Sequence, residues 1–355
     1  MKILDRFELG VGEADAPAET ARKSRGYACF DRLPRFEHIN AASVVEAVSL
    51  LKTYGGRAAL IAGGQDLLSR LRGRVHPALP RVLINIKTVQ PALDGIEETA
   101  DGLVIGSLAT LRRVETSPLV RRGYPVLGQA AYATRPLHYR NMATLGGDLC
   151  QQVRCWYYRA SGNAYHCRRK GGSDCPALEG DNRYHAVLGS QACVAVCPAD
   201  TAPALVALGA SLSIAGSRGE RTVPLEDFFT PLGNVLAPDE MVTGVMVPRP
   251  AADSRGTFLK FTVGNVFDRA LVSVAVTASL EDGVCRRARI VLGAVSPQPY
   301  RAVEAERELA GRRPDAVTAA RAAQAAVAAA RPLGKNGYKV DIARVLVQRA
   351  ILGLA

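Results

Sequence analysis

Five of the eight cysteines in this 355-residue chain lie between Arg154 and Asp200, in a stretch with little sign of regular secondary structure. The five are Cys155, Cys167, Cys175, Cys193 and Cys197. Long loops without regular structure are uncommon in compact domains. Thiolates that converge on a metal would order such a loop, because metal binding couples to folding. The segment therefore predicts a metal or iron–sulfur site.

We expect these thiols to be free ligands and not disulfides, which need an oxidising compartment. The N-terminal sequence MKILDRFELGVGEADAPAET has acidic residues and lacks the apolar core of a secretory signal. The longest apolar runs, such as Ala202–Leu212, fall short of the roughly 20 residues of a membrane span. The expected location is cytoplasmic, or periplasmic if a partner subunit carries an export signal.

Basic residues outnumber acidic ones, 45 to 33, which gives a formal net charge of +12. Such an excess of positive charge is typical of proteins that bind nucleic acid, an acidic protein or an anionic ligand. The sequence shows no zinc-finger spacing, helix-turn-helix signal or aromatic-basic RNA-binding motif, so no nucleic-acid partner is predicted. Hydrophobic residues make up 48%, and the length allows two or three domains with buried cores.

The first part of the chain has an α/β pattern. Asn40 is placed to cap a helix over Ala41–Tyr54, in which valines and leucines recur at helical spacing. A short buried strand, Ala58–Ala62, then runs into a glycine pair and a short helix, Asp66–Leu71. A second strand follows at Arg81–Lys87, and the order of strand, glycine turn, helix and strand is typical of α/β structure.

The later elements divide the chain near residues 248–255, where the sequence PRPAADSRG breaks the pattern. Further strands and helices are expected at Gly102–Ser107, from Thr110, over Thr201–Ile214, at Thr257–Val263, Ala270–Leu280 and Arg287–Ala294, and at Asp315–Arg331 and Asp341–Leu352. The predicted domains are an N-terminal extension (1–37), a cofactor-binding domain (38–248) with the cysteine segment inside it (about 150–199), and a C-terminal domain (255–355).

Two glycine pairs, each expected to form a turn, suit a phosphate-bearing cofactor. Gly63-Gly64 lies between a strand and a helix, and Gly146-Gly147 follows the donors Arg140, Asn141 and Thr144. Glycine allows a positive φ and lets a phosphate come close to backbone N–H groups. Neither pair matches the dinucleotide or P-loop signature, so neither of those sites is indicated.

The order of five motifs carries a resemblance: ALIAGGQDLL (59–68), RVLINI (81–86), LVIGSLATL (103–111), RNMATLGGDL (140–149) and DTAPALVALGA (200–210). The chain resembles the FAD-binding medium subunit of the molybdenum hydroxylase and xanthine dehydrogenase family. The segment KFTVGNVFDRALVSVA (260–275) is similar to the start of that family's C-terminal flavin domain. The resemblance implies an α+β fold, with a two-part FAD-binding domain of the PCMH-like type and a small antiparallel sheet with helices.

The resemblance also implies FAD as cofactor and a set of residues around it. Residues of the two glycine motifs would hold the pyrophosphate, and others the ribityl or isoalloxazine part. The implied residues are Leu60, Ile61, Ala62, Gly63, Gly64, Gln65, Asp66, Leu67, Leu68, Thr134, Asn141, Thr144, Gly146, Gly147, Asp148, Asp200, Thr243 and Lys260. For Lys260 a solvated lysine, and for Asp200 a helix cap, are the structural alternatives.

In most family members the LGG motif is followed closely by the DTAPAL helix, whereas here residues 147 and 200 are 53 positions apart. The insertion resembles that of flavin subunits with an additional 4Fe-4S cluster, found in the aldehyde oxidoreductase and 4-hydroxybenzoyl-CoA reductase types. The expected ligands are Cys155, Cys167, Cys175 and Cys193, since four thiolates are the usual complement. In the reductase type the last ligand lies closer to the third, where this chain has Tyr184, which favours the aldehyde oxidoreductase type.

Alternatives remain open for this segment. Cys197, which precedes Pro198, could replace Cys193 as a ligand, and four thiolates could hold structural zinc instead of a cluster. His138, His166 and His185 are expected to be structural and not ligands. Trp156, Tyr157 and Tyr158 are expected to shield the cluster, and Arg168, Arg169 and Lys170 to offset its charge.

The family pattern implies an electron-transfer subunit of a heterotrimeric oxidoreductase. A molybdopterin-containing large subunit would hydroxylate the substrate, and a 2Fe-2S small subunit would pass electrons to FAD. An external acceptor (NAD, ferredoxin, quinone or oxygen) would then reoxidise FAD. No catalytic acid or base is expected on this chain, because the flavin performs the redox chemistry. A self-contained flavin oxidase of the same fold and a zinc-stabilised scaffold are the alternatives.

Overall fold

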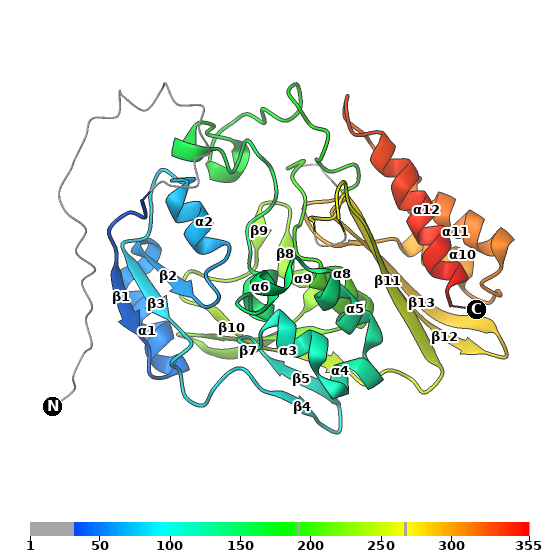
Figure 1. The fold of residues 1–355 in the computed structure, drawn as a ribbon, viewed down its shortest axis with the longest axis horizontal. Helices are drawn as coiled ribbons and strands as arrows, with labels where there is room; N and C mark the ends of the chain where they lie inside the picture. The colour runs from blue at the N-terminus through cyan, green and yellow to red at the C-terminus, as the bar shows by residue number, and fades with distance from the viewer. Residues whose placement is uncertain (1–31, 190–191, 266–267, 355) are drawn as a thin grey trace.

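The computed structural model describes residues 32–189, 192–265 and 268–354, and most of the predicted N-terminal extension, 1–37, lies outside them. The chain has the expected α+β architecture (Figure 1). Its first sheet is parallel, with the order β1-β3-β2. The elements of this part are β1 (Glu37–Asn40), α1 (Val44–Tyr54), β2 (Ala58–Ile61), α2 (Leu67–Arg72) and β3 (Val82–Asn85).

The predicted strand–glycine–helix–strand unit is therefore present, with one correction at its first helix. Asn40 is the last residue of β1 and does not cap α1. The cap is Ser43, whose side chain accepts a hydrogen bond from the backbone N–H of Glu46 at 3.1 Å. Asn40 instead accepts from the side-chain amide of Asn85 on β3, because the parallel pairing places these two residues opposite each other.

The second part is a five-stranded antiparallel sheet of order β4-β5-β10-β6-β7 with helices on it. Its strands are β4 (Ile96–Glu98), β5 (Gly102–Gly106), β6 (Ser211–Gly216), β7 (Gly219–Pro224) and β10 (Met241–Pro248), and a small pair is formed by β8 (Phe229–Thr230) and β9 (Gly233–Asn234). Its helices are α3 (Leu111–Thr116), α4 (Pro118–Gly123), α5 (Pro125–Ala133), α6 (Leu137–Arg140), α7 (Leu145–Leu149), α8 (Thr201–Ala207) and α9 (Leu225–Phe228).

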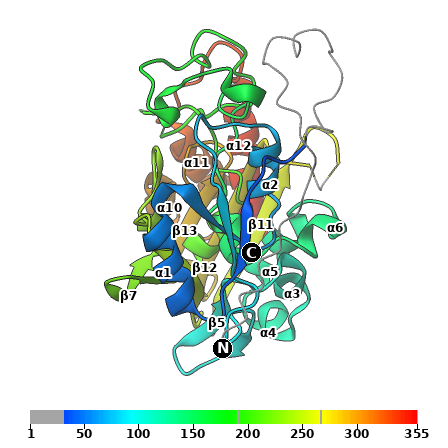
Figure 2. The same cartoon turned by 90° about the vertical axis from the view of Figure 1, so that its left-hand side faces the viewer.

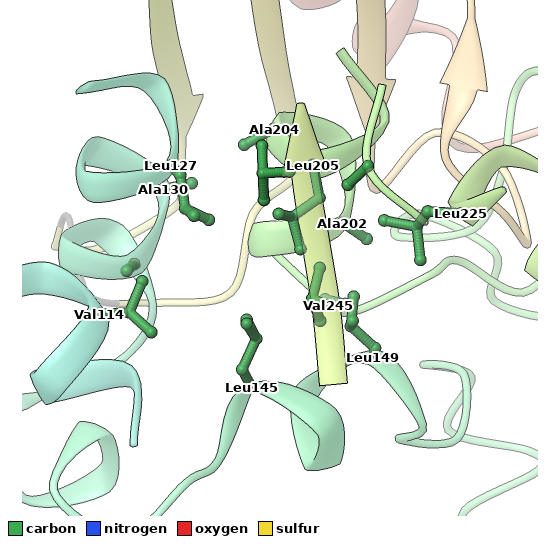
Figure 3. Close-up of a cluster of buried hydrophobic side chains, with 14 of the residues drawn as sticks. Val114, Leu127, Ala130, Leu145, Leu149, Ala202, Ala204, Leu205, Leu225 and Val245 are labelled. Carbon is green, nitrogen blue, oxygen red and sulfur yellow. The ribbon is translucent and has the colours of Figure 1, made fainter. Parts of the chain in front are cut away.

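The main core lies between this sheet and its helices. Figure 3 shows Val114, Leu145, Leu205 and Val245, which come from α3, α7, α8 and β10, meeting in one cluster. All four are fully buried. This packing fixes α7 and α8 against the central strand, so the segments that begin both helices are held at defined positions.

The C-terminal domain is a four-stranded antiparallel sheet, β11-β12-β13-β14, covered by three helices (Figure 1). Its elements are β11 (Ser254–Phe261), β12 (Val272–Glu281), β13 (Val284–Gly293), β14 (Tyr300–Arg301), α10 (Val303–Leu309), α11 (Ala316–Val327) and α12 (Tyr338–Leu352). One face of the sheet packs on these helices, and Phe258, Ala275 and Val291 join the core of the second part. The two parts are thus packed together directly.

Much of the described part of the cysteine segment, residues 150–189 and 192–199, lies at one end of the molecule in both views (Figures 1 and 2). Among its described residues the only helical pieces are two 3₁₀ turns, η3 (Ser161–Asn163) and η4 (Arg168–Lys170). At one side Arg159 pairs with Asp66 at 2.6 Å, and at the other the Tyr338 hydroxyl donates to the Arg183 carbonyl at 2.7 Å. The segment therefore joins the first part to the C-terminal helices.

No helix within the described ranges is long and apolar enough to cross a membrane.

Candidate cofactor sites

The two glycine motifs touch each other. A Cβ placed on Gly63 would lie 2.1 Å from the carbonyl oxygen of Met142 in the second motif. Gly64 has φ +70°, a left-handed conformation that an L side chain rarely adopts. Only glycine at Gly63 allows this approach of two backbones that are far apart in sequence.

The second motif is not the open turn that the sequence predicted. Gly146 and Gly147 lie in the short helix α7, which begins after Thr144. The Thr144 hydroxyl caps the helix by accepting from the N–H of Gly147 at 3.2 Å. Gly146 donates its N–H to the carbonyl of Ser107 at 2.9 Å, and a Cβ there would lie 2.8 Å from the Cβ of Ser107. Glycine is needed at this position for close packing on the end of β5.

A cavity of about 210 Å³ opens between the two motifs. Its walls contain most of the residues that the sequence predicted for FAD: Leu60, Ile61, Ala62, Gly63, Gly64, Gln65, Asp66, Leu67, Thr144, Gly146, Gly147 and Asp148. Ser107 also lines this wall, and its Oγ is buried with no hydrogen-bond partner among the described residues. A buried hydroxyl without a partner is unfavourable unless a ligand supplies one. The cavity therefore has the features of a site for a polar cofactor.

Two carboxyl groups in this wall differ in charge. Burial raises the pKa of Asp148 to about 7, while Thr201 and Gln151 donate hydrogen bonds to it, both at 2.6 Å. Burial also acts on Asp66, but the Arg159 and Arg70 guanidinium groups outweigh it and hold the pKa of Asp66 below its usual value. Near neutral pH, Asp148 thus carries less negative charge than a free aspartate, which suits the approach of a phosphate.

The other predicted FAD residues lie outside this cavity wall. Leu68 lines a neighbouring hollow beside Gly64, and Asn141 is exposed at the end of α6. Thr134 is buried and donates to the Ala130 carbonyl at 2.9 Å, whereas Thr243 donates to the Ser213 carbonyl at 3.2 Å. Both threonine hydroxyls are thus used within the fold.

Asp200 and Lys260 form a buried ion pair of 2.8 Å, with both side chains less than a tenth exposed. The Lys260 ammonium also donates to the Ala133 carbonyl at 2.7 Å. The pair joins the N-terminus of α8 to strand β11 of the C-terminal domain. The solvated-lysine alternative for Lys260 is therefore wrong in this structure, and Asp200 does not cap α8 through its side chain.

The four expected cysteine ligands line one small cavity of about 20 Å³. Cys155, Cys167, Cys175 and Cys193 are all free thiols, as are the other described cysteines. Cys197 is not on this wall; it lies on a larger cavity nearby. Within the part of the chain that the structure describes, no three His, Cys, Asp or Glu side chains are gathered closely enough to hold a metal ion. The thiols thus share a cavity without forming a closed ligand set.

Several N–H groups point at the sulfur atoms of this cavity. The backbone N–H of Tyr158 donates to Cys155 Sγ at 3.4 Å, and that of Ala195 donates to Cys193 Sγ at 3.4 Å. The Nε2 atom of His185 lies 3.2 Å from Cys155 Sγ. Burial, then the nearby Lys339 ammonium, lowers the pKa of His185 to about 4, so the ring is neutral. Burial raises the pKa of the Cys155 thiol to about 12.

The aromatic and basic residues of the segment divide between two cavities. Tyr157, Tyr158, Arg168 and Arg169 line the cysteine cavity. Trp156 lies instead on a cavity of about 570 Å³ and is 39% exposed.

This larger cavity lies between the cysteine segment and the C-terminal domain. Its charged and polar wall residues are Arg135, Arg154, Arg159, His185, Asp200, Asp268 and Arg269, and Cys155, Trp156, Tyr184 and Cys197 also line it. Burial, followed by repulsion from Arg159, Arg269 and Arg135, lowers the pKa of Arg154 to about 7. The sequence did not point to this cavity, because its walls come from segments more than 100 residues apart.

The sequence also missed several residues of the first cavity. The wall also contains residues that were not predicted: Arg70, Ile86, Ser107, Leu108, Tyr139, Ala143, Cys150, Gln151, Leu236, Glu240, Met241 and Val242. Met241 and Val242 reach it because β10 pairs between β5 and β6. The motifs already contained Ile86, Ser107, Leu108 and Ala143, so these were residues that the sequence could have supplied.

Comparison with known proteins agrees with these features. The family model described as "FAD binding domain in molybdopterin dehydrogenase" matches residues 34–250, and that of the "CO dehydrogenase flavoprotein C-terminal domain" matches residues 265–354. The FAD-binding subunit of an aldehyde oxidoreductase from Escherichia coli is 33% identical over 87% of this chain and 94% of its own length. The carbon monoxide dehydrogenase medium chain of Hydrogenophaga pseudoflava is 30% identical over 90% and 96%.

Solved structures show the same relationship. A carbon monoxide dehydrogenase structure from Hydrogenophaga pseudoflava superposes with a TM-score of 0.73 and 29% identity, over 90% of this chain and 97% of the other. Quinoline 2-oxidoreductase from Pseudomonas putida gives a TM-score of 0.72 and 28% identity, over 91% and 98%. The similarity thus extends over both parts of the fold.

Proposed function

Since the chain belongs to the family of FAD-binding medium subunits of the molybdenum hydroxylases, we propose that it binds FAD between its two glycine motifs and transfers electrons within a heterotrimeric oxidoreductase. The single observation that carries this proposal is the contact of Gly63 with Met142, which closes a cavity between both motifs. A cofactor bound there would meet backbone from two distant segments at once.

The residues of this cavity would have separate tasks. Backbone N–H groups near Gly64 would bind the pyrophosphate, since glycine leaves the backbone open to a phosphate. The Ser107 hydroxyl, which has no described partner, would donate to the cofactor. Asp148, whose pKa is raised, would add little negative charge beside the phosphates. The Asp200–Lys260 pair would lie near the flavin end and hold two parts of the fold in register.

FAD supplies the redox chemistry, and the chain positions it and excludes water. The substrate would be hydroxylated on a molybdopterin-containing large subunit, and electrons would arrive through a 2Fe-2S small subunit. An external acceptor would remove them. No side chain of this subunit needs to act as an acid or base on the substrate. We place the complex in the cytoplasm, or in the periplasm if a partner is exported.

We further propose that the cysteine segment holds a 4Fe-4S cluster with Cys155, Cys167, Cys175 and Cys193 as ligands. Their common cavity and the N–H groups directed at Cys155 and Cys193 support this set. Thiolate ligands commonly accept such hydrogen bonds, which tune the cluster's potential. Since the described thiols are not gathered at ligand distance, cluster binding would have to draw the segment closer together.

Metal, sulfide and flavin content of the anaerobically purified chain tests both proposals. We expect one FAD per chain and about four iron and four sulfide, as four thiolate ligands imply. A colourless protein with zinc and no sulfide would favour the zinc scaffold and reject the cluster. If the purified chain is folded but contains no FAD, the flavin proposal is rejected. If the isolated chain oxidised a substrate without its partners, the self-contained oxidase would replace the subunit function.

A further inference from the structure

The cavity of about 570 Å³ has an unusual excess of positive charge. Four arginines line it, Arg135, Arg154, Arg159 and Arg269, but only two described carboxylates do. One of these, Asp200, is already neutralised by Lys260. The other, Asp268, accepts a hydrogen bond from the backbone N–H of Asn265 at 3.1 Å. The wall therefore lacks the anions that would balance its guanidinium groups.

Only one of the four arginines has a carboxylate partner among the described residues. Arg159 pairs with Asp66 at 2.6 Å. Arg135, Arg154 and Arg269 have no such ion pair in the described ranges, and the Nε of Arg154 is buried without a hydrogen-bond partner. Gathering like charges in a partly enclosed space costs free energy unless an anion joins them. These arginines are thus arranged for a ligand and not for the stability of the fold.

The backbone conformation of Arg135 also indicates a ligand site. Its φ is +56°, in the left-handed region that favours glycine. Such strain in a side-chain-bearing residue persists where the surrounding structure imposes it, and it is common at ligand sites. Arg135 also places its guanidinium over the ring of Tyr139 at 5.2 Å, and Tyr139 lines the first cavity. The two cavities are therefore neighbours.

The position of the cavity suggests what the anion does. One wall contains Asp200, beside the proposed flavin position, and another contains Cys155 and His185 of the cysteine segment. Trp156 and Tyr184 add aromatic surface, and Trp156 is partly exposed to solvent. A molecule held here would lie between both proposed redox centres and remain accessible from outside.

We propose that this cavity binds a small anionic electron acceptor, which reoxidises the complex. The inference rests on the proposed function, because the electrons come from the reduced flavin. With ferricyanide as the acceptor, the two electrons of one reduced FAD reduce two ferricyanide ions to two ferrocyanide ions. FAD returns to its oxidised form, and its protons pass to solvent. Guanidinium groups suit such a ligand because they bind anions through charge-assisted hydrogen bonds, and a bound anion favours their charged form.

The test compares an anionic with a neutral acceptor in the assembled, FAD-loaded complex. For each variant, kcat/KM is measured with ferricyanide and with p-benzoquinone, and the ratio of the two is taken. We expect Arg154→Gln and Arg269→Gln each to lower this ratio, by about tenfold, because each variant removes one positive charge beside the bound anion. Arg183→Gln is the matched control, since Arg183 belongs to the same segment but is exposed and paired with Asp181 at 2.8 Å. It should leave the ratio unchanged.

Flavin content separates this inference from the proposed function. If the wild-type complex contains no FAD, the proposed function fails first. If Arg154→Gln and Arg269→Gln retain FAD and keep the wild-type ratio, the acceptor site is rejected. If these variants lose FAD while Arg183→Gln retains it, the arginines serve the flavin itself, and the inference is equally overturned. A lower ratio with full FAD content supports it.

Discussion

The Nε2 atom of His185 lies 3.2 Å from the Sγ atom of Cys155. The carbonyl oxygen of His185 accepts hydrogen bonds from Lys339 at 3.0 Å and from Asn336 at 3.2 Å. Lys339 is fully buried at the start of α12. The C-terminal domain therefore sets the position of a ring that contacts the first expected cluster ligand. The sequence suggested a structural role for His185, and the structure places its ring in contact with the sulfur.

Replacing His185 should lower the reduction potential of the proposed cluster. A hydrogen bond to a thiolate stabilises the more negative, reduced state, so His185→Phe should lower the potential by up to roughly 60 mV, which equals a tenfold change for one electron. Potentiometric titration followed by electron paramagnetic resonance measures this. His166→Phe, an exposed position in the same segment, should leave the potential unchanged. An unchanged potential in His185→Phe would show that the ring does not donate to the sulfur.

Gly63→Ala should abolish FAD binding while the chain still folds. The added Cβ would lie 2.1 Å from the Met142 carbonyl oxygen, so the two motifs must separate and the cavity between them must open. We expect FAD content to fall at least tenfold. Gly56→Ala is the control, because no atom lies within 4 Å of a Cβ at that position. Flavin absorbance of the purified proteins checks both, and equal FAD content would contradict the proposed site.

Local patterns explain why part of this site was predictable. The unit from β2 through Gly63-Gly64 to α2 and β3 consists of neighbouring residues, and its hydrophobic pattern and glycines were enough to predict it. The second motif was misread, because the cap by Thr144 and the packing of Gly146 on Ser107 turn a glycine-rich sequence into a helix. A glycine pair alone does not carry that information.

The parts of the fold and of the site that were not predicted depend on contacts between residues far apart in the sequence. Strand β10 was not predicted, although it lies at the centre of the five-stranded sheet and brings Met241 to the cavity. The contact of His185 with Cys155 depends on Lys339, which lies about 150 residues further along the chain. Such contacts follow from tertiary packing, and no periodicity in a single sequence records them.

Substitution of an expected cluster ligand should lower the iron content of the chain, whereas substitution of Cys197 should not. Substitution of Cys193 by serine should remove most of the iron, because the thiolate completes the ligand set. Cys197→Ser should retain it, since Cys197 lies on the neighbouring cavity and not on the one shared by Cys155, Cys167, Cys175 and Cys193. Iron and sulfide assays on both variants decide the matter. The reverse result would make Cys197 the fourth ligand.

Asp148 should make the stability of the chain depend on pH. Its pKa is raised from 3.8 to about 7 by burial, so the folded state holds a proton that the unfolded state has lost. This proton stabilises the fold fully below about pH 4, and the contribution is lost as the pH rises through about 7. Asp148→Asn should remove this dependence and unfold at higher urea concentration than the wild type at pH 8. Urea unfolding of the FAD-free chain at pH 5 and pH 8 measures the free energy of unfolding of both proteins. If this free energy changed equally with pH in the wild type and in Asp148→Asn, the raised pKa of Asp148 would be contradicted.

Breaking the Asp200–Lys260 pair should destabilise the chain more than removing it entirely. Lys260→Met leaves the Asp200 carboxylate buried without its partner, which costs about 3–5 kcal/mol. The double variant Asp200→Asn, Lys260→Met has no buried charge at this position, so it should recover part of the loss. Because the pair joins α8 to β11, Lys260→Met should also loosen the contact between the FAD-binding part and the C-terminal domain. Urea unfolding of the single and double variants gives the coupling free energy. If the double variant were as unstable as the sum of the two single variants, the two side chains would act independently, and their ion pair could not be what holds these domains together.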